Sequence, residues 1–384
     1  MKTPRSISTS SRIGFSVLLM LTALAVTPHY AAANTASNTA IINTATVNYK
    51  DAGGTAQTAV TASATVTITL VASSPTLNAP ADKNTTVNVA ANYNTYTITS
   101  NANGPDSYNL TIPVKTNSAN ITASSAVPPA SVTLGATTIF TPVTIAAAGT
   151  TVITVPSDTV SNASVNGIAN GATIVINGQI YTVASIVDNA ILTSTITVNG
   201  NGAASAALLY GTVIGEQKTF TLAVTPTAMN PTTTDETITT TLSARDSGNL
   251  AVAATDITVT TVQGASLTVT KQVSTDGITW GATANAAPLA PLYYRITVHN
   301  GGAANATVVV ITDPLTPYTT YTPGSGKMVI GAAAAYGGTA LSDANPGIPA
   351  DTYDYTAGTV TYSVATILPG AANDVQLFFK VTIK

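Results

Sequence analysis

Two stretches near the N-terminus alternate between apolar and polar residues with a period of two. One face of the first stretch is formed by Ile41, Ala45, Val47 and Tyr49, with Asn43 as its polar exception. One face of the second is formed by Val60, Ala62, Ala64, Val66, Ile68 and Leu70. A period of two is typical of a half-buried strand, and the glycines of residues 50–54 suit a turn. The pattern therefore predicts a β-hairpin.

The rest of the chain repeats this kind of pattern. Thr, Val and Ile alternate, Gly, Pro and Asn interrupt them at short intervals, and the helical period is close to absent. This combination predicts an all-β protein built of sandwiches. The expected strands include residues 86–89, 93–100, 150–155, 237–245, 292–299 and 374–383.

Internal similarity divides the chain into domains. Residues 96–104 and 294–302 align as a strand that runs into a Gly-containing turn. Between them lies a segment with a different sequence pattern, in which Asn177-Gly178 is a hairpin signal. We expect two immunoglobulin-like β-sandwich domains in tandem, with a small inserted β-subdomain and an N-terminal β-hairpin. The expected bounds are 1–33 for a signal peptide, 34–72 for the hairpin, 73–155 plus 211–263 for the first sandwich, 156–210 for the insertion and 264–384 for the C-terminal domain.

The N-terminus has the order of a secretory signal peptide. Basic residues precede an apolar run over residues 13–26, and Ala31-Ala32-Ala33 offers a cleavage site. We expect an exported protein at the cell surface or outside the cell, with no membrane span in the mature chain. Without residues 1–33 the chain holds 10 basic and 16 acidic residues, a net charge of −6, so nucleic acid is not an expected partner. It has no cysteine, so disulfides do not stabilise it.

Several motifs of the C-terminal third and of the hairpin resemble a known family. The motifs are Leu267-Thr-Val-Thr-Lys271, Tyr294 with Asn300 and Gly302, Val308-Val-Val-Ile-Thr-Asp-Pro-Leu315, Leu368-Pro369-Gly370 and residues 43–49. They are similar to the conserved-repeat domain of unknown function found in tandem on bacterial and archaeal cell-surface proteins. The resemblance implies an immunoglobulin-like fold at a cell surface and no catalytic activity, and it transfers no functional residues.

Residues that carry catalytic chemistry are scarce in the mature chain. It has one histidine, His299, and two glutamates, so catalytic triads and His-Cys zinc sites are not expected. We predict no enzyme, no cofactor and no metal site. The acidic loop with Asp343, Asp351 and Asp354 is expected to be solvated rather than to bind calcium. An alternative to a structural role is an adhesin that binds surface glycans through Trp280, Tyr318 and Tyr321.

The ends of the chain look complementary, which suggests how copies join. Residues 49–53 resemble residues 244–248, the turn of a hairpin that closes the middle domain, whereas the C-terminal domain ends without such a hairpin. The hairpin either folds back on the adjoining sandwich, which its position favours, or completes the C-terminal domain of another copy in a head-to-tail homopolymer. The candidate assembly residues are Ile41, Ala45, Val47, Tyr49, Val60, Val66, Ile68 and Leu70 on the hairpin, and Val375, Leu377, Phe379, Val381 and Ile383 on the last strand.

Overall fold

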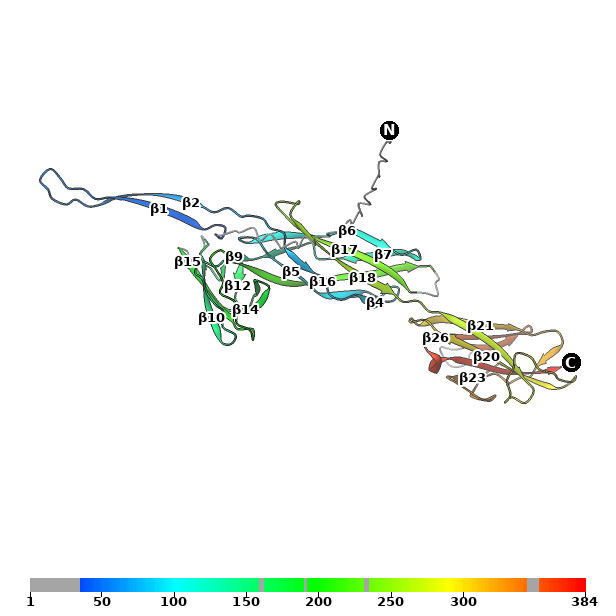
Figure 1. Ribbon diagram of the computed structural model, residues 1–384. Coiled ribbons are helices and arrows are strands. Elements are labelled where there is room, and N and C mark those ends of the chain that lie inside the picture. Colours follow the sequence, from blue (N-terminus) through cyan, green and yellow to red (C-terminus); the bar gives the residue numbers. More distant parts are fainter. Residues whose placement is uncertain (1–34, 159–161, 190–191, 231–234, 344–351) are drawn as a thin grey trace, which may run out of the picture.

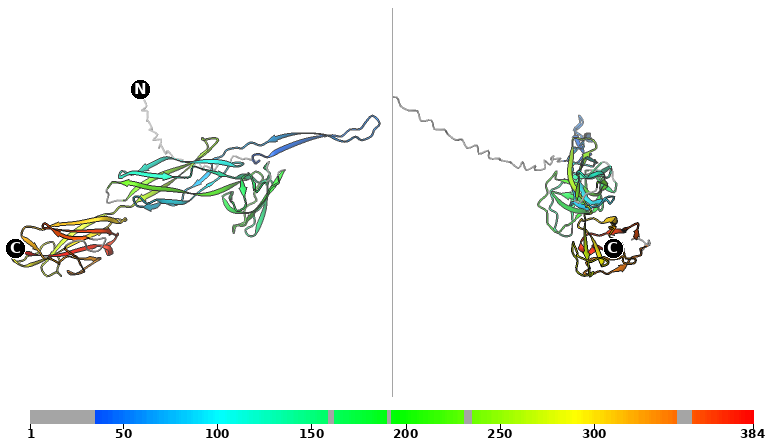
Figure 2. Two further views of the ribbon diagram at one scale, coloured as in Figure 1. Left: turned by 180° about the vertical axis from the view of Figure 1, so that it is seen from behind. Right: turned by 90° about the vertical axis from the view of Figure 1, so that its right-hand side faces the viewer.

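The computed structural model describes residues 35–158, 162–189, 192–230, 235–343 and 352–384 (Figure 1). The expected signal peptide lies outside these residues. The described chain is almost entirely β-structure, arranged in sheets that pack as sandwiches. Figures 1 and 2 place the N-terminal hairpin at one end of an elongated molecule and the C-terminal domain at the other.

The N-terminal hairpin consists of β1 (Ala40–Val47) and β2 (Val60–Thr67). The two strands pair antiparallel with each other and with no other described strand. The hairpin therefore forms a separate two-stranded sheet.

The first sandwich has two facing sheets around one hydrophobic core. Its first sheet holds β3 (Thr76–Asn78), β5 (Ala91–Thr99), β7 (Ile121–Val127), β9 (Ala136–Thr138) and the long β16 (Val213–Met229). Its second sheet runs in the order β4 (Lys83–Thr85), β18 (Ala253–Val262), β17 (Glu236–Asp246), β6 (Asp106–Asn117) and β8 (Ser131–Leu134). The predicted strand at residues 86–89 is instead a turn after β4.

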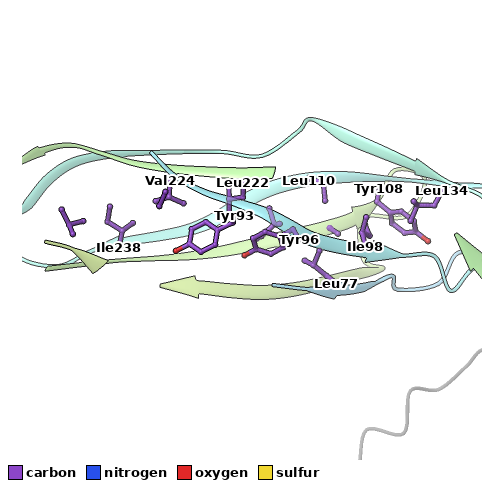
Figure 3. Packing of buried hydrophobic residues seen from close by; sticks show 14 of the residues in the cluster. Leu77, Tyr93, Tyr96, Ile98, Tyr108, Leu110, Leu134, Leu222, Val224 and Ile238 are labelled. Carbon is purple, nitrogen blue, oxygen red and sulfur yellow. The ribbon is translucent and has the colours of Figure 1, made fainter. Parts of the chain in front are cut away.

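Tyrosines of β5 connect the two sheets of this sandwich (Figure 3). The Tyr93 hydroxyl donates to the Val259 oxygen at 3.0 Å and lies 2.8 Å from Thr260 Oγ1. The Tyr96 hydroxyl donates to Thr258 Oγ1 at 3.4 Å. Because both rings are fully buried, these bonds satisfy polar groups that burial would otherwise destabilise. The hairpin β17–β18 is thus fixed to the core by hydrogen bonds as well as by apolar packing.

An inserted subdomain extends the first sheet from β16. Its main strands are β10 (Thr150–Pro156), β13 (Thr173–Ile176), β14 (Gln179–Val187) and β15 (Thr193–Asn199), and β11 (Ser164–Val165) and β12 (Ile168–Ala169) form a small ribbon beside them. Its own core includes Ile139, Ile145 and Ile153. The subdomain therefore begins before the predicted residue 156, and β10 belongs to it because β10 pairs with β15.

The C-terminal domain is a second sandwich with unequal sheets. The larger sheet holds β19 (Leu267–Ser274), β20 (Pro291–Asn300), β22 (Thr319–Tyr321), β23 (Lys327–Ile330), β24 (Thr339–Ala340) and β27 (Val375–Ile383). The smaller sheet has the order β21 (Ala306–Pro314), β26 (Thr359–Ile367) and β25 (Thr352–Thr356), and a 3-10 turn spans Ala371–Asn373.

Two carboxyl groups, Asp106 and Asp246, are buried together at one end of the first sandwich. Burial and the hydrogen bond to Asp246 raise the pKa of Asp106 from its ordinary value of 3.8 to about 7. Folding therefore holds a proton on Asp106 at pH values where the unfolded chain has released it.

We predict that Asp106 makes the free energy of unfolding decrease as the pH rises from about 4 to about 7. In this range the unfolded carboxyl is ionised while the folded one is still protonated. Asp106→Asn keeps the side chain neutral, so its stability should depend less on pH than that of the wild type. Urea denaturation at pH 5 and pH 8 gives the change in the free energy of unfolding between these two pH values for the wild type and for Asp106→Asn. An equal change in the two proteins would contradict the prediction.

Candidate assembly interface

The hairpin presents one apolar face to solvent. The register pairs Ile41 with Val66 and Val47 with Val60, so the odd positions of β1 and the even positions of β2 share a face. Every residue of both strands is exposed. The predicted apolar face is therefore formed, but no part of the described protein covers it.

Asn103 fixes the base of the hairpin to the first sandwich. Its Oδ1 accepts the Val71 amide at 2.7 Å, and its Nδ2 donates to the Thr35 and Thr69 oxygens at 3.1 and 3.3 Å. Its backbone oxygen accepts the Ser37 amide at 2.9 Å. One side chain thus holds both ends of the hairpin, and we call it the Asn103 clamp.

The residue after the clamp allows the two segments to approach closely. A Cβ added to Gly104 would lie 1.7 Å from Ser37 Oγ, far inside van der Waals contact. Only glycine fits at this position without movement of the hairpin base.

A second buried asparagine, Asn300, holds the segment that enters the C-terminal domain. Asn300 is fully buried, and its Oδ1 accepts the Ser266 amide at 3.1 Å. Its Nδ2 donates to the Ala304 and Ile367 oxygens at 2.9 and 3.0 Å. In both places a buried asparagine at the end of a core strand holds the segment that enters its domain: Asn103 lies in the turn after β5, and Asn300 is the last residue of β20. The hairpin β1–β2 therefore precedes the first sandwich in the same way as β17–β18 precedes the C-terminal domain.

The turns of these two hairpins use the same chemistry. Asp51 Oδ1 accepts the Gly53 amide at 3.0 Å, and Asp246 Oδ1 accepts the Gly248 amide at 2.7 Å. Both are aspartate-stabilised turns. The two hairpins differ in their surroundings, because β17 pairs with β6 and β18 pairs with β4 inside a sheet, whereas β1–β2 is free.

The prediction that the hairpin folds back on its own sandwich is wrong for this structure. Only its base, through Ala36, Ser37 and the Asn103 clamp, contacts the sandwich closely. The strands point away from it (Figure 2). The clamp sets this direction, because it holds both ends of the hairpin at one end of the first sandwich.

The candidate residues of the last strand do not form a free edge. β27 pairs with β20 on one side and with β22 and β23 on the other. Val375, Leu377, Phe379 and Val381 are buried in the core, and Ile383 is half-buried. The backbone of β27 has no free side for a further strand, so an acceptor edge has to lie elsewhere in this domain.

The three aromatic residues of the expected glycan platform lie apart. Trp280 packs on Phe378 with ring centroids 5.6 Å apart. Tyr321 is buried, and the backbone oxygen of Tyr318, whose side chain is exposed, accepts the Lys384 amide at the end of β27. Phe378 and Lys384 are separated by six positions of an extended strand, roughly 20 Å. These side chains therefore do not form a common surface.

Polar residues considered for chemistry are bonded within the protein. His299 is half-buried, with Nδ1 2.6 Å from Asp374 Oδ1, and Asp343 accepts the Tyr321 hydroxyl at 2.7 Å. Asp351 lies outside the described residues. Within the part of the chain that the structure describes, no cluster of histidine and acidic residues suits a metal ion, and no helix has the length and apolarity to cross a membrane.

Comparison with models of known protein families and with curated proteins finds no match to this chain. The resemblance to the cell-surface repeat domain therefore stays a hypothesis that rests on its motifs.

We predict that Asn103→Ala loosens the base of the hairpin. The substitution removes the acceptor of the Val71 amide, and loss of one such bond corresponds to about 1–3 kcal/mol, or roughly 5- to 150-fold faster hydrogen exchange at Val71. The Ser37 amide serves as an internal reference because it bonds to the backbone oxygen of residue 103. Unchanged exchange at Val71 would contradict the clamp, and Asn92→Ala, on an exposed side chain of β5, is the control.

Proposed function

We propose that this chain is an exported, non-enzymatic structural subunit that joins copies of itself head to tail into a fibre or layer at the cell surface. The N-terminal hairpin of one copy is the donor, and the C-terminal domain of the next copy is the acceptor. The observation that carries this proposal is a formed hairpin whose apolar face has no cover within its own chain.

The exposed face is costly for an isolated monomer. Ile41, Val47, Val60 and Val66 are 49–62% exposed, and full burial of such a side chain contributes about 1.5–3 kcal/mol. A free pair of strands also offers unpaired backbone groups to any sheet edge. Both properties favour insertion of the hairpin into another sheet.

The position of the two ends supports a polymer rather than a closed monomer. The hairpin and the C-terminal domain lie at opposite ends of the molecule (Figure 1), so the donor of one copy cannot reach the acceptor of the same copy. A contact between two different surfaces repeats from copy to copy, and it gives a filament unless the rotation closes a ring.

A structural role also agrees with the lack of reactive groups. The whole chain has no cysteine and two histidines, and the described histidine is paired with Asp374. Turnover of a polymer by the purified protein, abolished by a point substitution, would contradict the non-enzymatic assignment.

We predict that assembly depends on one face of the hairpin. Val47→Asp places a carboxylate on the apolar face, where burial without a partner costs about 3–5 kcal/mol and weakens association by roughly 100-fold or more. Thr46→Asp, its neighbour on the opposite face, is the matched control and should assemble like the wild type. Both positions are exposed in the monomer, so both variants should fold.

Electron microscopy and sedimentation of the mature protein measure the outcome. The wild type and Thr46→Asp should form filaments, whereas Val47→Asp and a chain without residues 35–70 should remain monomeric. Equal assembly of Val47→Asp and Thr46→Asp would exclude the hairpin as the donor, and a wild type that stays monomeric would contradict the proposed function.

A further inference from the structure

We infer that a groove between β19 and β21 of the C-terminal domain is the acceptor, and that β1 of a second copy pairs there antiparallel with β21. This inference rests on the proposed function and adds to it the acceptor surface. The groove between β19 and β21 takes the place of β27 as the expected acceptor, because both sides of β27 are already paired.

The groove is bounded by two free sheet edges. β21 pairs only with β26, and β19 pairs only with β20 apart from one bridge between Val273 and Gly281. Among the described residues no strand covers the other side of either edge. Such edges offer the backbone hydrogen bonds that strand addition uses.

The side of β19 that faces the core is exposed to solvent at Val269. Val269 lies opposite Val298, which is buried, yet Val269 is 62% exposed. In the first sandwich the corresponding edge strand β3 carries Leu77 opposite the buried Ile98, and Leu77 is 8% exposed. The difference arises because the second sheet of the first sandwich extends over β3, whereas its counterpart over β19 is missing.

The missing part can be identified by comparing the two domains. β6 and β21 each follow the buried asparagine, and each pairs on one side with a strand of its own domain, β8 or β26. On its other side β6 pairs antiparallel with β17 of the hairpin β17–β18. Among the described residues the same side of β21 is unpaired, so this part of the domain has no counterpart of the hairpin β17–β18.

A tyrosine beside the groove also lacks the partner that a docked hairpin supplies. The Tyr96 hydroxyl in the first sandwich bonds to Thr258 of the docked hairpin. Tyr294 is the corresponding residue of the internal repeat, and it is half-buried. No described residue forms a hydrogen bond with the Tyr294 hydroxyl, so a hairpin in the groove would find a free donor there.

An ion pair holds the two walls of the groove together. Lys271 of β19 donates to Asp313 of β21 with Nζ 2.7 Å from Oδ1, and the Lys271 ammonium lies 4.6 Å from the centre of the Tyr294 ring. The Asp313 side chain is 8% exposed. Since the pair links the two edge strands, the spacing of the walls is set before any partner arrives.

The hairpin of a second copy is the occupant that fits. The same chain carries β1–β2, which has the turn chemistry of the docked β17–β18 and, like it, is followed by a segment that a buried asparagine holds. Side chains directly opposite each other in an antiparallel pair share a face. The odd positions of β1, apolar except for Asn43, therefore face the core beside Val309 and Ile311, and the even positions, which include Ile42, lie outside beside Val310 and Thr312.

The internal repeat also indicates the register. Asp51 corresponds to Asp246, and Tyr294 corresponds to Tyr96, so the pairing of β17 with β6 transfers to β1 and β21. Thr46 corresponds to Thr241, which pairs with Val114, so this transfer places Thr46 opposite Thr312. Thr46 and Thr312 both point outward, which makes them suitable for a cross-link.

The test separates donor and acceptor on different chains. Val269→Arg blocks the groove of a chain that keeps its hairpin, and deletion of residues 35–70 leaves a chain with an intact groove only. We expect each to be monomeric alone and the mixture to stop at heterodimers, as measured by sedimentation. Ile330→Arg, in the same domain and 63% exposed, is the matched control and should assemble like the wild type.

A disulfide trap locates the contact independently, because the natural chain has no cysteine. The trap uses Thr46→Cys on the Val269→Arg chain, which keeps its donor hairpin, and Thr312→Cys on the chain lacking residues 35–70, which supplies the only intact groove in the mixture. We expect a disulfide-linked dimer under oxidising conditions. Thr44→Cys and Ile42→Cys, on the same outer face, sample registers shifted by two and by four residues.

The outcomes distinguish this inference from the proposed function. If Val269→Arg assembles as well as Ile330→Arg, or if none of the three donor cysteines links to Thr312→Cys while the wild type still forms filaments, the groove is not the acceptor and the structural role stands. If the wild type does not assemble, the proposed function itself fails.

Discussion

Unpaired strand edges are the constraint on which this structure depends. A β-strand satisfies its backbone groups only through neighbouring strands, and a two-stranded sheet leaves its outer edges and both faces open. In the first sandwich β17–β18 lies between β6 and β4, so its edges and its inner face are covered. The hairpin β1–β2 resembles β17–β18 but pairs with no other described strand. In the C-terminal domain the edges of β19 and β21 are unpaired among the described strands.

The buried asparagines Asn103 and Asn300 explain how these unpaired edges come to lie at opposite ends of one chain. Asn103 holds the entering segment through bonds to the Thr35, Thr69 and Val71 backbone, and Asn300 holds it through the Ser266 amide. Because the entering segment is fixed there, the hairpin that precedes it is directed away from its own domain and towards the preceding one. For β17–β18 the preceding domain is in the same chain. For β1–β2 no preceding domain lies within the described residues, and its strands stay exposed.

Much of the fold could be read from local patterns. The faces of the hairpin, its turn at Asp51 and most strands follow from alternation and turn residues, because side-chain direction in a strand depends only on sequence parity. One expectation failed for a long-range reason. The strand at residues 150–156 joins the insertion through pairing with residues 193–199, and the sequence around a strand does not specify which distant strand it will pair with.

The candidate interface divides in the same way. The sequence by itself determined that an apolar hairpin exists and which residues form its apolar face. Only the tertiary structure decided that the hairpin stands free of its own sandwich, that both sides of β27 are occupied, and that the open edges belong to β19 and β21. The physical reason is that an edge is a property of the whole sheet: a strand becomes an edge when no other segment, however distant in sequence, supplies the hydrogen bonds on its remaining side.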